Sequence, residues 1–458
     1  MKQLITVMQT MLAWTLVLGC VLLIAVFSGS RPSVDDAALA VAKRAEFAFQ
    51  AKVTVAQAVL MNRADPGGKG AKGVELLPGI EAAAGTRPER RLEVAILAGE
   101  LDGDAAAQER LVALSASHAE AVQRQAAEPP MAMPNGLAAA AADALLLQGW
   151  YAGQELSPED RAGLHARHGW FAHLALARGA MRGDAAQDAA YEPALRAFSF
   201  AAVIFGGLAC GLIAGLVLGI IVLVRAGTGT WHWRHVPPTP QQELPWLWAF
   251  GVYLAGFIGW SLMISSLGLP AMQSIWGFLP VLALLMTLVL RRQGWPAVQA
   301  ALGLTRGAGI LRELGAGLVG YLIGLPLVGI GLLMSNALSR YLGEPNHPII
   351  EDAIAGRWLL MIMTACIFAP VVEELMFRGC LHHHLRARRG PWLAALAGGL
   401  IFAAIHPQGL AALPVLTAIG MVFALIRTWR QSILASITAH ACHNGLAVTV
   451  LMLQMGMS

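Results

Sequence analysis

The sequence is short of charge. Only 13% of its 458 residues are Asp, Glu, Lys or Arg, about half of the roughly 25% found in soluble domains. The charges are also unevenly placed, since 21 of the 28 acids precede Arg196 and all five lysines lie in the first 72 positions. This scarcity excludes a disordered chain, a nucleic-acid binder with a basic face and an ordinary soluble enzyme. With a mean hydropathy of +0.59, the second part of the chain is suited to lipid.

The polar stretch between Ser28 and Arg196 lacks cysteine, runs of β-branched or aromatic residues and a glycine-rich phosphate loop. The missing cysteines exclude a disulfide framework, and the missing strand patterns exclude a sheet. Alanine-rich segments with apolar residues at helical spacing predict a bundle of roughly six helices here. No cluster of His, Cys and Asp is evident in this stretch, and the sequence does not identify a partner for it.

Nine apolar runs approach or reach the length of about 20 residues that a membrane-spanning helix needs. They are Leu4–Phe27, Phe198–Val224, Pro245–Leu267, Met272–Leu290, Leu314–Leu338, Trp358–Phe377, Trp392–His406, Leu410–Ile426 and Ile433–Leu453. The first run is too long for a signal-peptide core of about 7–15 residues, and no A-x-A cleavage site follows it, so we expect an uncleaved anchor. The sequence therefore predicts an all-α polytopic membrane protein with about nine transmembrane helices and an Ala-rich helical extramembrane domain between the first two.

Arginine in the short loops predicts the orientation, because cytoplasmic loops carry an excess of basic residues. The arginines after the second, fourth, sixth and eighth runs are Arg225, Arg234, Arg291, Arg292, Arg306, Arg312, Arg386, Arg388, Arg389, Arg427 and Arg430. This pattern predicts a cytoplasmic N-terminus and an extracytoplasmic domain at 29–196. We expect an integral protein of the bacterial cell (inner) membrane.

Two carboxylates fall inside a predicted span. Of the seven acids after Arg196, five lie in loops or at helix ends, whereas Glu373 and Glu374 are adjacent within the sixth apolar run. An ionisable residue inside a span costs several kcal/mol and marks a functional site by default. Two adjacent carboxylates repel each other when both are ionised, so one of them is suited to accept a proton as a general base does. Arg378 can pair with Glu374 at helical i,i+4 spacing.

Polar residues in two further spans lie at a similar depth. Phe402 and His406 end the seventh run, and the ninth contains His440 and Asn444, which share one helix face. At about 1.5 Å of rise per residue, Glu373 and His406 lie roughly 20 and 22 Å from the arginine-marked surface. His440 and Asn444 lie roughly 15 and 21 Å from it. The common depth predicts one shared site inside the membrane.

These residues form three motifs, which are Glu373-Glu374-x-x-x-Arg378, Phe402-x-x-x-His406 and His440-x-x-x-Asn444, all within 72 residues. Together and in this order, they resemble the motifs of the CAAX protease and bacteriocin-processing (CPBP) family. This family comprises intramembrane endopeptidases related to the type 2 CAAX prenyl protease. The resemblance covers roughly 314–453 and does not extend to 28–196.

The resemblance implies a role for each residue. Glu373 and His406 would hold and deprotonate the attacking water, and His440 and Asn444 would donate to the oxyanion. Glu374, Arg378 and Phe402 would support the site. The chain is then divided into an N-terminal transmembrane anchor (1–28), a helical soluble domain (29–196), accessory transmembrane helices (197–313) and a CPBP-like catalytic transmembrane core (314–458). The expected activity is endopeptidase cleavage of a membrane-associated protein or peptide by glutamate-activated water.

Several alternatives stay open. Glu373, His406 and His440 could ligate zinc or another divalent metal, since two histidines and a carboxylate form catalytic zinc sites. The H-E-x-x-H signature is absent, so we expect no cofactor. A catalytically idle binding or immunity protein would keep the same fold, and a proton-coupled transporter would use buried Glu and His as a relay. The expected partners are membrane lipid and a membrane-anchored or apolar peptide, with no nucleic acid.

Overall fold

The computed structural model describes residues 2–30, 36–64, 73–127, 135–179, 184–230, 243–267, 294–345 and 349–456. All regular secondary structure in these ranges is helical, as expected for an all-α chain. The chain divides into two compact units. Unit 1 comprises residues 1–40 and 208–452, and unit 2 comprises 41–207 and 453–458.

Seven helices in the described ranges are long and apolar enough to cross a membrane. They are Leu4–Val26, Asp188–Gly227, Leu244–Met263, Ile310–Leu342, Trp358–Arg386, Leu410–Arg430 and Ile433–Gly456. These seven agree with seven of the nine predicted runs, and the chain is an integral membrane protein. The predicted run Met272–Leu290 lies outside the described residues. The predicted run Trp392–His406 forms the shorter apolar helix α18 (Pro391–Ala404).

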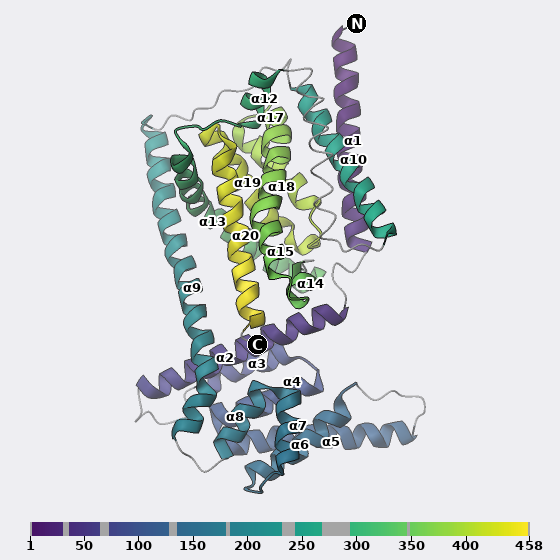
Figure 1. Ribbon diagram of the computed structural model, residues 1–458, viewed down its shortest axis with the longest axis vertical. Coiled ribbons are helices and arrows are strands. Elements are labelled where there is room, and N and C mark those ends of the chain that lie inside the picture. The colour runs from purple at the N-terminus through teal and green to yellow at the C-terminus, as the bar shows by residue number, and fades with distance from the viewer. Residues whose placement is uncertain are drawn as a thin grey trace. The chain divides into compact units, whose positions relative to one another are not determined.

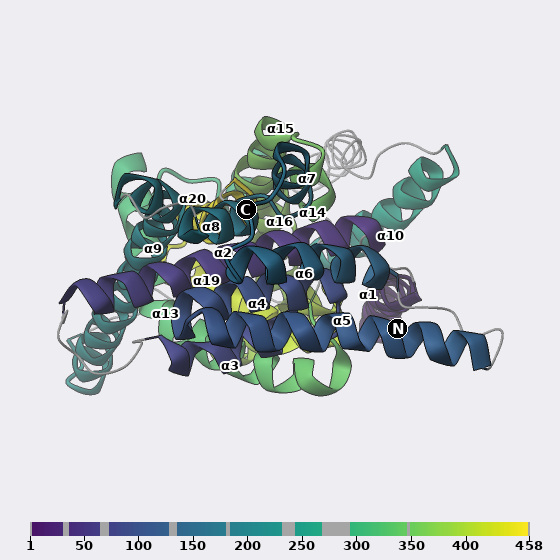
Figure 2. The same cartoon turned by 90° about the horizontal axis from the view of Figure 1, so that it is seen from below.

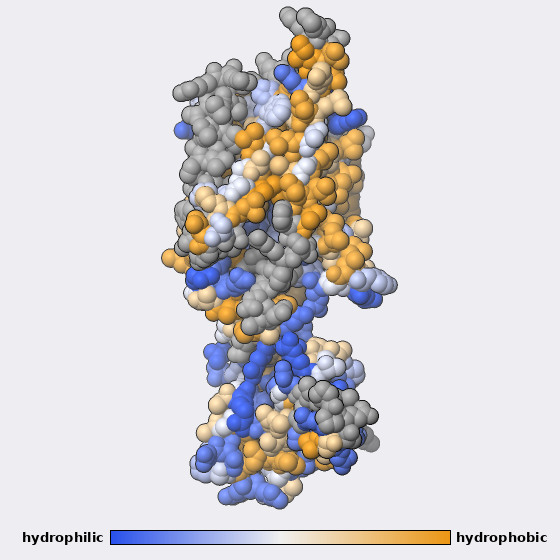
Figure 3. All heavy atoms as spheres, turned by 90° about the vertical axis from the view of Figure 1, so that its right-hand side faces the viewer, coloured by the Kyte–Doolittle hydropathy of each residue, from blue (hydrophilic) through white to orange (hydrophobic). Residues whose placement is uncertain are grey.

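Unit 1 begins with α1 (Lys2–Ser30), which packs along α10 (Leu244–Ser266) (Figure 1). Their buried side chains join one hydrophobic cluster with the helices of the motif region, including Val17, Phe250 and Phe377. Large apolar side chains remain on the outside, as in the last part of α9 (Asp184–Gly227), where Ile213 and Leu223 are 62% and 71% exposed. Figure 3 shows hydrophobic side chains over unit 1 on the side of α1 and α10. Such a surface suits contact with lipid tails.

The helices α13, α18, α19 and α20 form the scaffold of the C-terminal part of unit 1. The long helix α13 (Ile310–Leu342) packs on α19 (Leu413–Arg430), which also packs on α18. The last helix is α20 (Ile433–Gly456) (Figure 1). Small residues allow these backbones to approach closely, as is common between membrane helices. A methyl group at Gly317 of α13 would lie 2.4 Å from the Ala435 carbonyl oxygen of α20.

The first motif lies on an irregular helical run. It comprises α15 (Trp358–Met363), the π-helical turn η3 (Thr364–Phe368), α16 (Ala369–Glu373), the π-helical turn η4 (Glu374–Leu381) and α17 (His382–Arg386). Pro370 lacks the N–H that would bond to the Cys366 carbonyl in an α-helix, which disturbs the ladder next to η3. Turns of this kind often mark functional sites. The boundary between α16 and η4 falls between Glu373 and Glu374.

Short elements complete unit 1. They are α12 (Trp295–Leu302), α14 (Ile349–Ile354) and the 3₁₀ turn η5 (Leu410–Ala412), which precedes α19. Between α18 and η5 the chain is not helical, and His406 lies in this connection. The end of α18 therefore determines where His406 is placed.

Unit 2 is also helical. Its helices α4 (Pro88–Asp102), α5 (Asp104–Ala127) and α6 (Leu137–Tyr151) pack as consecutive neighbours (Figure 2). The remaining elements are α2 (Asp36–Ala64), η1 (Val74–Leu76), α3 (Leu77–Ala84), α7 (Pro158–His168), α8 (Trp170–Gly179) and the first part of α9. One leucine from each of α4, α5 and α6 is fully buried in the core, namely Leu92, Leu111 and Leu147.

A buried charge network of residues that are far apart in the sequence crosses this core. His168 Nε2 lies 3.0 Å from Asp143 Oδ2, and Nδ1 lies 3.5 Å from Glu93 Oε1. Arg167 pairs with the other Asp143 oxygen at 2.6 Å. Burial alone would lower the pKa of His168, but its bonds to the two carboxylates outweigh this and raise the pKa. Protonated His168 therefore stabilises unit 2, and this contribution is lost as the pH rises through the raised pKa.

The crossing of α18 and α19 generates a stability prediction. A methyl group at Gly399 would lie 2.6 Å from the Thr417 carbonyl oxygen, whereas one at Gly398 meets nothing closer than 3.8 Å. We expect Gly399→Ala to destabilise the protein by about 1–3 kcal/mol, because the two backbones must separate. The matched Gly398→Ala variant should change stability by less than about 0.5 kcal/mol. Melting of both variants in detergent measures the difference, and equal melting temperatures would contradict the close crossing.

Candidate active site

Glu373 faces two histidines from other elements. Its Oε2 atom lies 3.9 Å from His406 Nε2 and 3.8 Å from His440 Nε2. The Glu373 side chain is 25% exposed, whereas those of His406 and His440 are 17% and 4% exposed. The buried Oε2 atom has no hydrogen-bond partner. Three polar groups therefore converge on one point. They come from the end of α16, the α18–η5 connection and α20, and their separations are too long for direct hydrogen bonds.

The second nitrogen of each histidine is fixed by another group. His406 Nδ1 lies 2.6 Å from the Phe402 carbonyl oxygen, to which it donates. His440 Nδ1 lies 3.0 Å from Glu374 Oε1, a carboxylate that accepts from it. These bonds set the ring orientation, so that both Nε2 atoms point toward Glu373. The i,i+4 spacing of Phe402 and His406 supplies the first of these bonds.

Glu374 connects the elements of the site through its contacts with Arg378 and His440. Its side chain is fully buried and its Oε1 lies 3.0 Å from Arg378 Nη1, at the predicted i,i+4 spacing. Arg378 Nη2 donates to the Gly420 carbonyl of α19 at 3.0 Å. The guanidinium also lies over the rings of Phe402 and Phe423, 4.8 and 5.2 Å from their centroids. Glu374 thus connects the first motif to α19 through Arg378 and to α20 through His440.

Asn444 contacts the motif run at a different point. Its Nδ2 donates to the Ala365 carbonyl at 2.7 Å. Ala365 lies in the π-helical turn η3, where the altered bonding pattern leaves a carbonyl to be satisfied by a side chain. The second N–H of the same amide stays available for another acceptor. The structure therefore places Asn444 beside the motif helix, one turn along α20 from His440.

Some contacts of the site lie outside the three motifs. Phe423 stacks on His440 with ring centroids 4.7 Å apart and an angle of 24° between the rings. The Gly420 carbonyl accepts from Arg378. Gly420 and Phe423 both belong to α19. His443 meets Tyr321 of α13, with Nδ1 3.0 Å from the hydroxyl. A phenylalanine or a glycine in an apolar run carries no chemical signal of its own, so the sequence did not indicate these contacts.

The alternative metal site requires a tighter cluster. In the part of the chain that the structure describes, no group of three or more His, Cys, Asp or Glu residues has the spacing to hold a metal ion. Tetrahedral zinc with ligands at about 2.0–2.1 Å brings its donor atoms to roughly 3.3 Å from one another. The corresponding distances from Glu373 to His406 and His440 are 3.9 and 3.8 Å.

Comparison with known proteins agrees with this geometry. Residues 355–446 match the family model described as type II CAAX prenyl endopeptidase Rce1-like. This segment of the chain is therefore similar to the Rce1-like family. The family consists of intramembrane proteases, and the matched segment contains all three motifs. The chain is also similar to an uncharacterized 24.3 kDa protein of Escherichia coli, with 29% identity over 168 residues that cover 35% of this chain and 72% of that protein. No solved structure matches the chain.

The ion pair of the Rce1-like segment generates a stability prediction. Arg378→Gln leaves the Glu374 carboxylate buried without its cation, so we expect a loss of about 3–5 kcal/mol. The double variant Glu374→Gln/Arg378→Gln removes both charges and should lose clearly less than the sum of the single variants. Unfolding of the full chain in detergent measures all three. Strictly additive losses would show that the two side chains are not coupled.

Proposed function

We propose that this chain is an intramembrane endopeptidase in which Glu373 activates a water molecule. The observation that carries the proposal is the convergence of Glu373 Oε2, His406 Nε2 and His440 Nε2 at 3.8–3.9 Å. Such separations suit a bridging water, which sits at normal hydrogen-bond distance from each group. The partial exposure of Glu373 gives a substrate access to this point, while the burial of His440 keeps the surroundings low in dielectric constant.

In the proposed reaction, Glu373 accepts a proton from the water as the oxygen attacks the carbonyl carbon of the scissile peptide bond. His406 orients the water by accepting its second hydrogen at Nε2, because its own proton is on Nδ1. The tetrahedral intermediate then collapses as the C–N bond breaks. The proton held by Glu373 passes to the leaving amine, so the products are a carboxylic acid and an amine.

His440 and Asn444 would stabilise the oxyanion. Asn444 has one amide N–H beyond the one that it donates to Ala365. Since the Nδ1 proton of His440 is used by Glu374, its Nε2 can donate only when the ring carries both protons. Donors of this kind contribute about 2.7–4 kcal/mol each to lowering the barrier.

The proposed substrate is a membrane-anchored protein or an apolar peptide. A water-activating group on a helix that is long enough to cross the membrane acts on peptide bonds that reach the same depth.

We also propose a topology for the chain in the inner membrane of a bacterium. The N-terminus would be cytoplasmic and residues 29–196 would lie on the opposite side of the membrane, since arginine is concentrated in alternate loops. Residues 29–196 would then contact an extracytoplasmic partner.

The function is tested by the conservative change Glu373→Gln. It keeps the size of the side chain but removes the proton acceptor, so we expect a loss of activity of at least about 100-fold. Proteolysis profiling of membrane proteins from cells with the parent chain or the variant measures this. Glu351→Gln, an exposed carboxylate of the same unit, is the matched control. Identical cleavage patterns for Glu373→Gln and the parent would instead favour a noncatalytic binding protein or a proton-coupled transporter.

We propose that no metal takes part, and chelation tests this part of the mechanism. The activity that depends on Glu373 should persist in EDTA and in 1,10-phenanthroline, because the carboxylate alone accepts the proton. Loss of this activity in chelator, with recovery on addition of zinc, would assign Glu373, His406 and His440 as metal ligands instead.

A further inference from the structure

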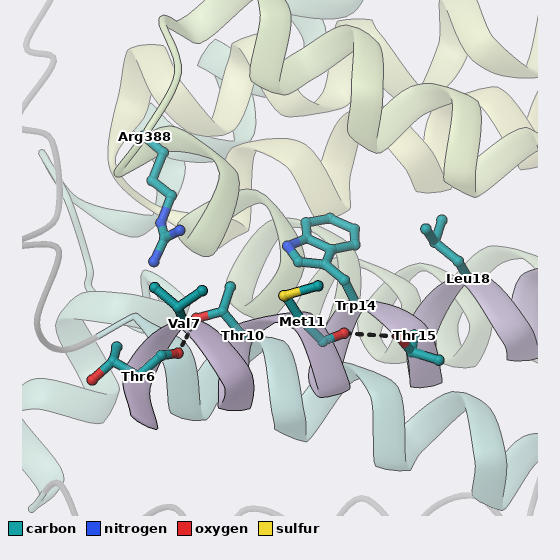
Figure 4. Close-up of a pocket in the computed structure, with 8 residues that line it drawn as sticks. All are labelled: Thr6, Val7, Thr10, Met11, Trp14, Thr15, Leu18 and Arg388. Atoms are coloured by element: carbon teal, nitrogen blue, oxygen red, sulfur yellow. Dashed lines mark hydrogen bonds between the residues drawn. The ribbon is translucent and has the colours of Figure 1, made fainter. Parts of the chain in front are cut away.

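A groove beside α1 lies apart from the candidate active site. It has a volume of about 490 Å³ and is lined by α1 residues between Thr6 and Leu18 and by Arg388 from the turn after α17. Figure 4 shows these side chains on the side of α1 that faces Arg388. The groove runs over 13 residues of α1, from Thr6 to Leu18, and the 12 steps between them correspond to about 18 Å along the helix axis. We call it the α1 groove.

Arg388 is the charged residue of the groove lining and lies at one end of it. Arg388 is 44% exposed, and its Nε donates to the buried carboxylate of Glu243. No hydrogen bond occupies its two Nη atoms in the described part of the chain, so they can still donate to an anion. Glu243 orients the guanidinium, which reaches toward α1 in Figure 4. A fork of N–H donors held in place by a carboxylate is well suited to a phosphate group.

The remainder of the α1 groove is mainly apolar. Val7, Met11 and Leu18 are 54%, 65% and 54% exposed, although they belong to a candidate membrane span. The hydroxyls of Thr10 and Thr15 donate to the backbone at Thr6 and Met11, so they add no free donor to the groove.

Trp14 lies near the middle of the α1 groove, between Met11 and Leu18. Its ring lies against His384 at 5.6 Å, and its indole nitrogen lies on the side facing Arg388 in Figure 4. Tryptophan is enriched at the level of lipid headgroups because its ring is apolar and its N–H is a donor. Along α1 in Figure 4, Arg388 lies over Val7, Trp14 follows after Met11, and Leu18 lies beyond Trp14.

The charge around Arg388 selects the sign of the ligand. The nearby arginines Arg386 and Arg389 follow the same span, whereas Glu243 is already paired with Arg388. In the sequence, the stretches 231–242 and 268–309 contain no acid. This end of unit 1 therefore has a surplus of positive charge, which attracts anions and disfavours a cationic headgroup.

We propose that the α1 groove binds an anionic phospholipid, with its phosphate group on Arg388 and Trp14 and one acyl chain along Val7, Met11 and Leu18. The length of the groove fits a headgroup together with the first part of an acyl chain. A peptide helix would leave the Arg388 donors without a phosphate, and free phosphate would leave the apolar wall uncovered. The site is independent of the proposed protease activity.

Lipid binding to the delipidated full-length protein in detergent tests this proposal. The probes are dioleoylphosphatidylglycerol, dioleoylphosphatidylcholine and inorganic phosphate, and the readouts are native mass spectrometry and the shift in melting temperature. We expect phosphatidylglycerol to bind and to raise the melting temperature, with weaker effects of phosphatidylcholine and none of phosphate. Equal effects of the two lipids, or an effect of phosphate alone, would overturn the proposal.

Paired variants locate the site. Arg388→Gln should weaken binding of phosphatidylglycerol roughly tenfold or more, whereas Arg389→Gln, its exposed neighbour outside the groove, should not. Because Arg388→Gln leaves the Glu243 carboxylate buried without its cation, the double variant Glu243→Gln/Arg388→Gln repeats the test without a buried charge.

A second pair of variants tests the apolar part of the groove. Val7→Trp should fill the groove and block binding, whereas Met8→Trp, on an exposed residue outside the lining, should leave binding unchanged. Equal losses in both members of either pair would show diffuse attraction rather than a site.

Discussion

The buried charge network of Glu374, Arg378 and His440 is the constraint on which the rest of the site depends. Removing ions from water costs several kcal/mol per ion, so the network persists only because each member has partners. Arg378 bonds to the Gly420 carbonyl and lies over two aromatic rings, and Glu374 accepts from His440. Three separate elements are thereby held at one place. The position of the His440 ring, and with it the geometry around Glu373, follows from this network.

The adjacency of the two glutamates is central to this arrangement. One of them is fully buried and tied to a cation, while the other is partly exposed and its Oε2 has no hydrogen-bond partner. A single residue step separates two environments, because adjacent side chains point about 100° apart around a helix. The first glutamate is then left for chemistry, and the second supports the histidine that faces it. Neighbouring residues of the same type thus take on different tasks through burial alone.

Much of this was readable from the sequence because charge is so rare in a membrane span. Glu373, Glu374, His406 and His440 stand out in apolar runs, and counting residues from the arginine-rich loops indicated a common depth. The Glu374–Arg378 pair also followed from i,i+4 spacing. Seven of the predicted spans were found because hydropathy over about 20 residues reports directly on burial in lipid.

Other features depend on tertiary contacts that leave no local pattern. The π-helical turn η3 lies next to Pro370, and a proline alone indicates a kink without its form. The stacking of Phe423 on His440 could not be separated from ordinary packing. In unit 2, His168, Asp143 and Glu93 are far apart along the chain and meet only once α4, α6 and α7 have packed. Their apolar neighbours gave no reason to group them.

The short helix α18 has a consequence for the surrounding bilayer. Its 14 residues extend about 21 Å, less than the hydrocarbon thickness of about 30 Å. The non-helical chain after it has backbone groups that hydrocarbon cannot solvate. A bilayer adapts to so short a helix by thinning beside it, or the connection is covered by protein and water. Because His406 directly follows α18, either response bears on the depth at which His406 lies.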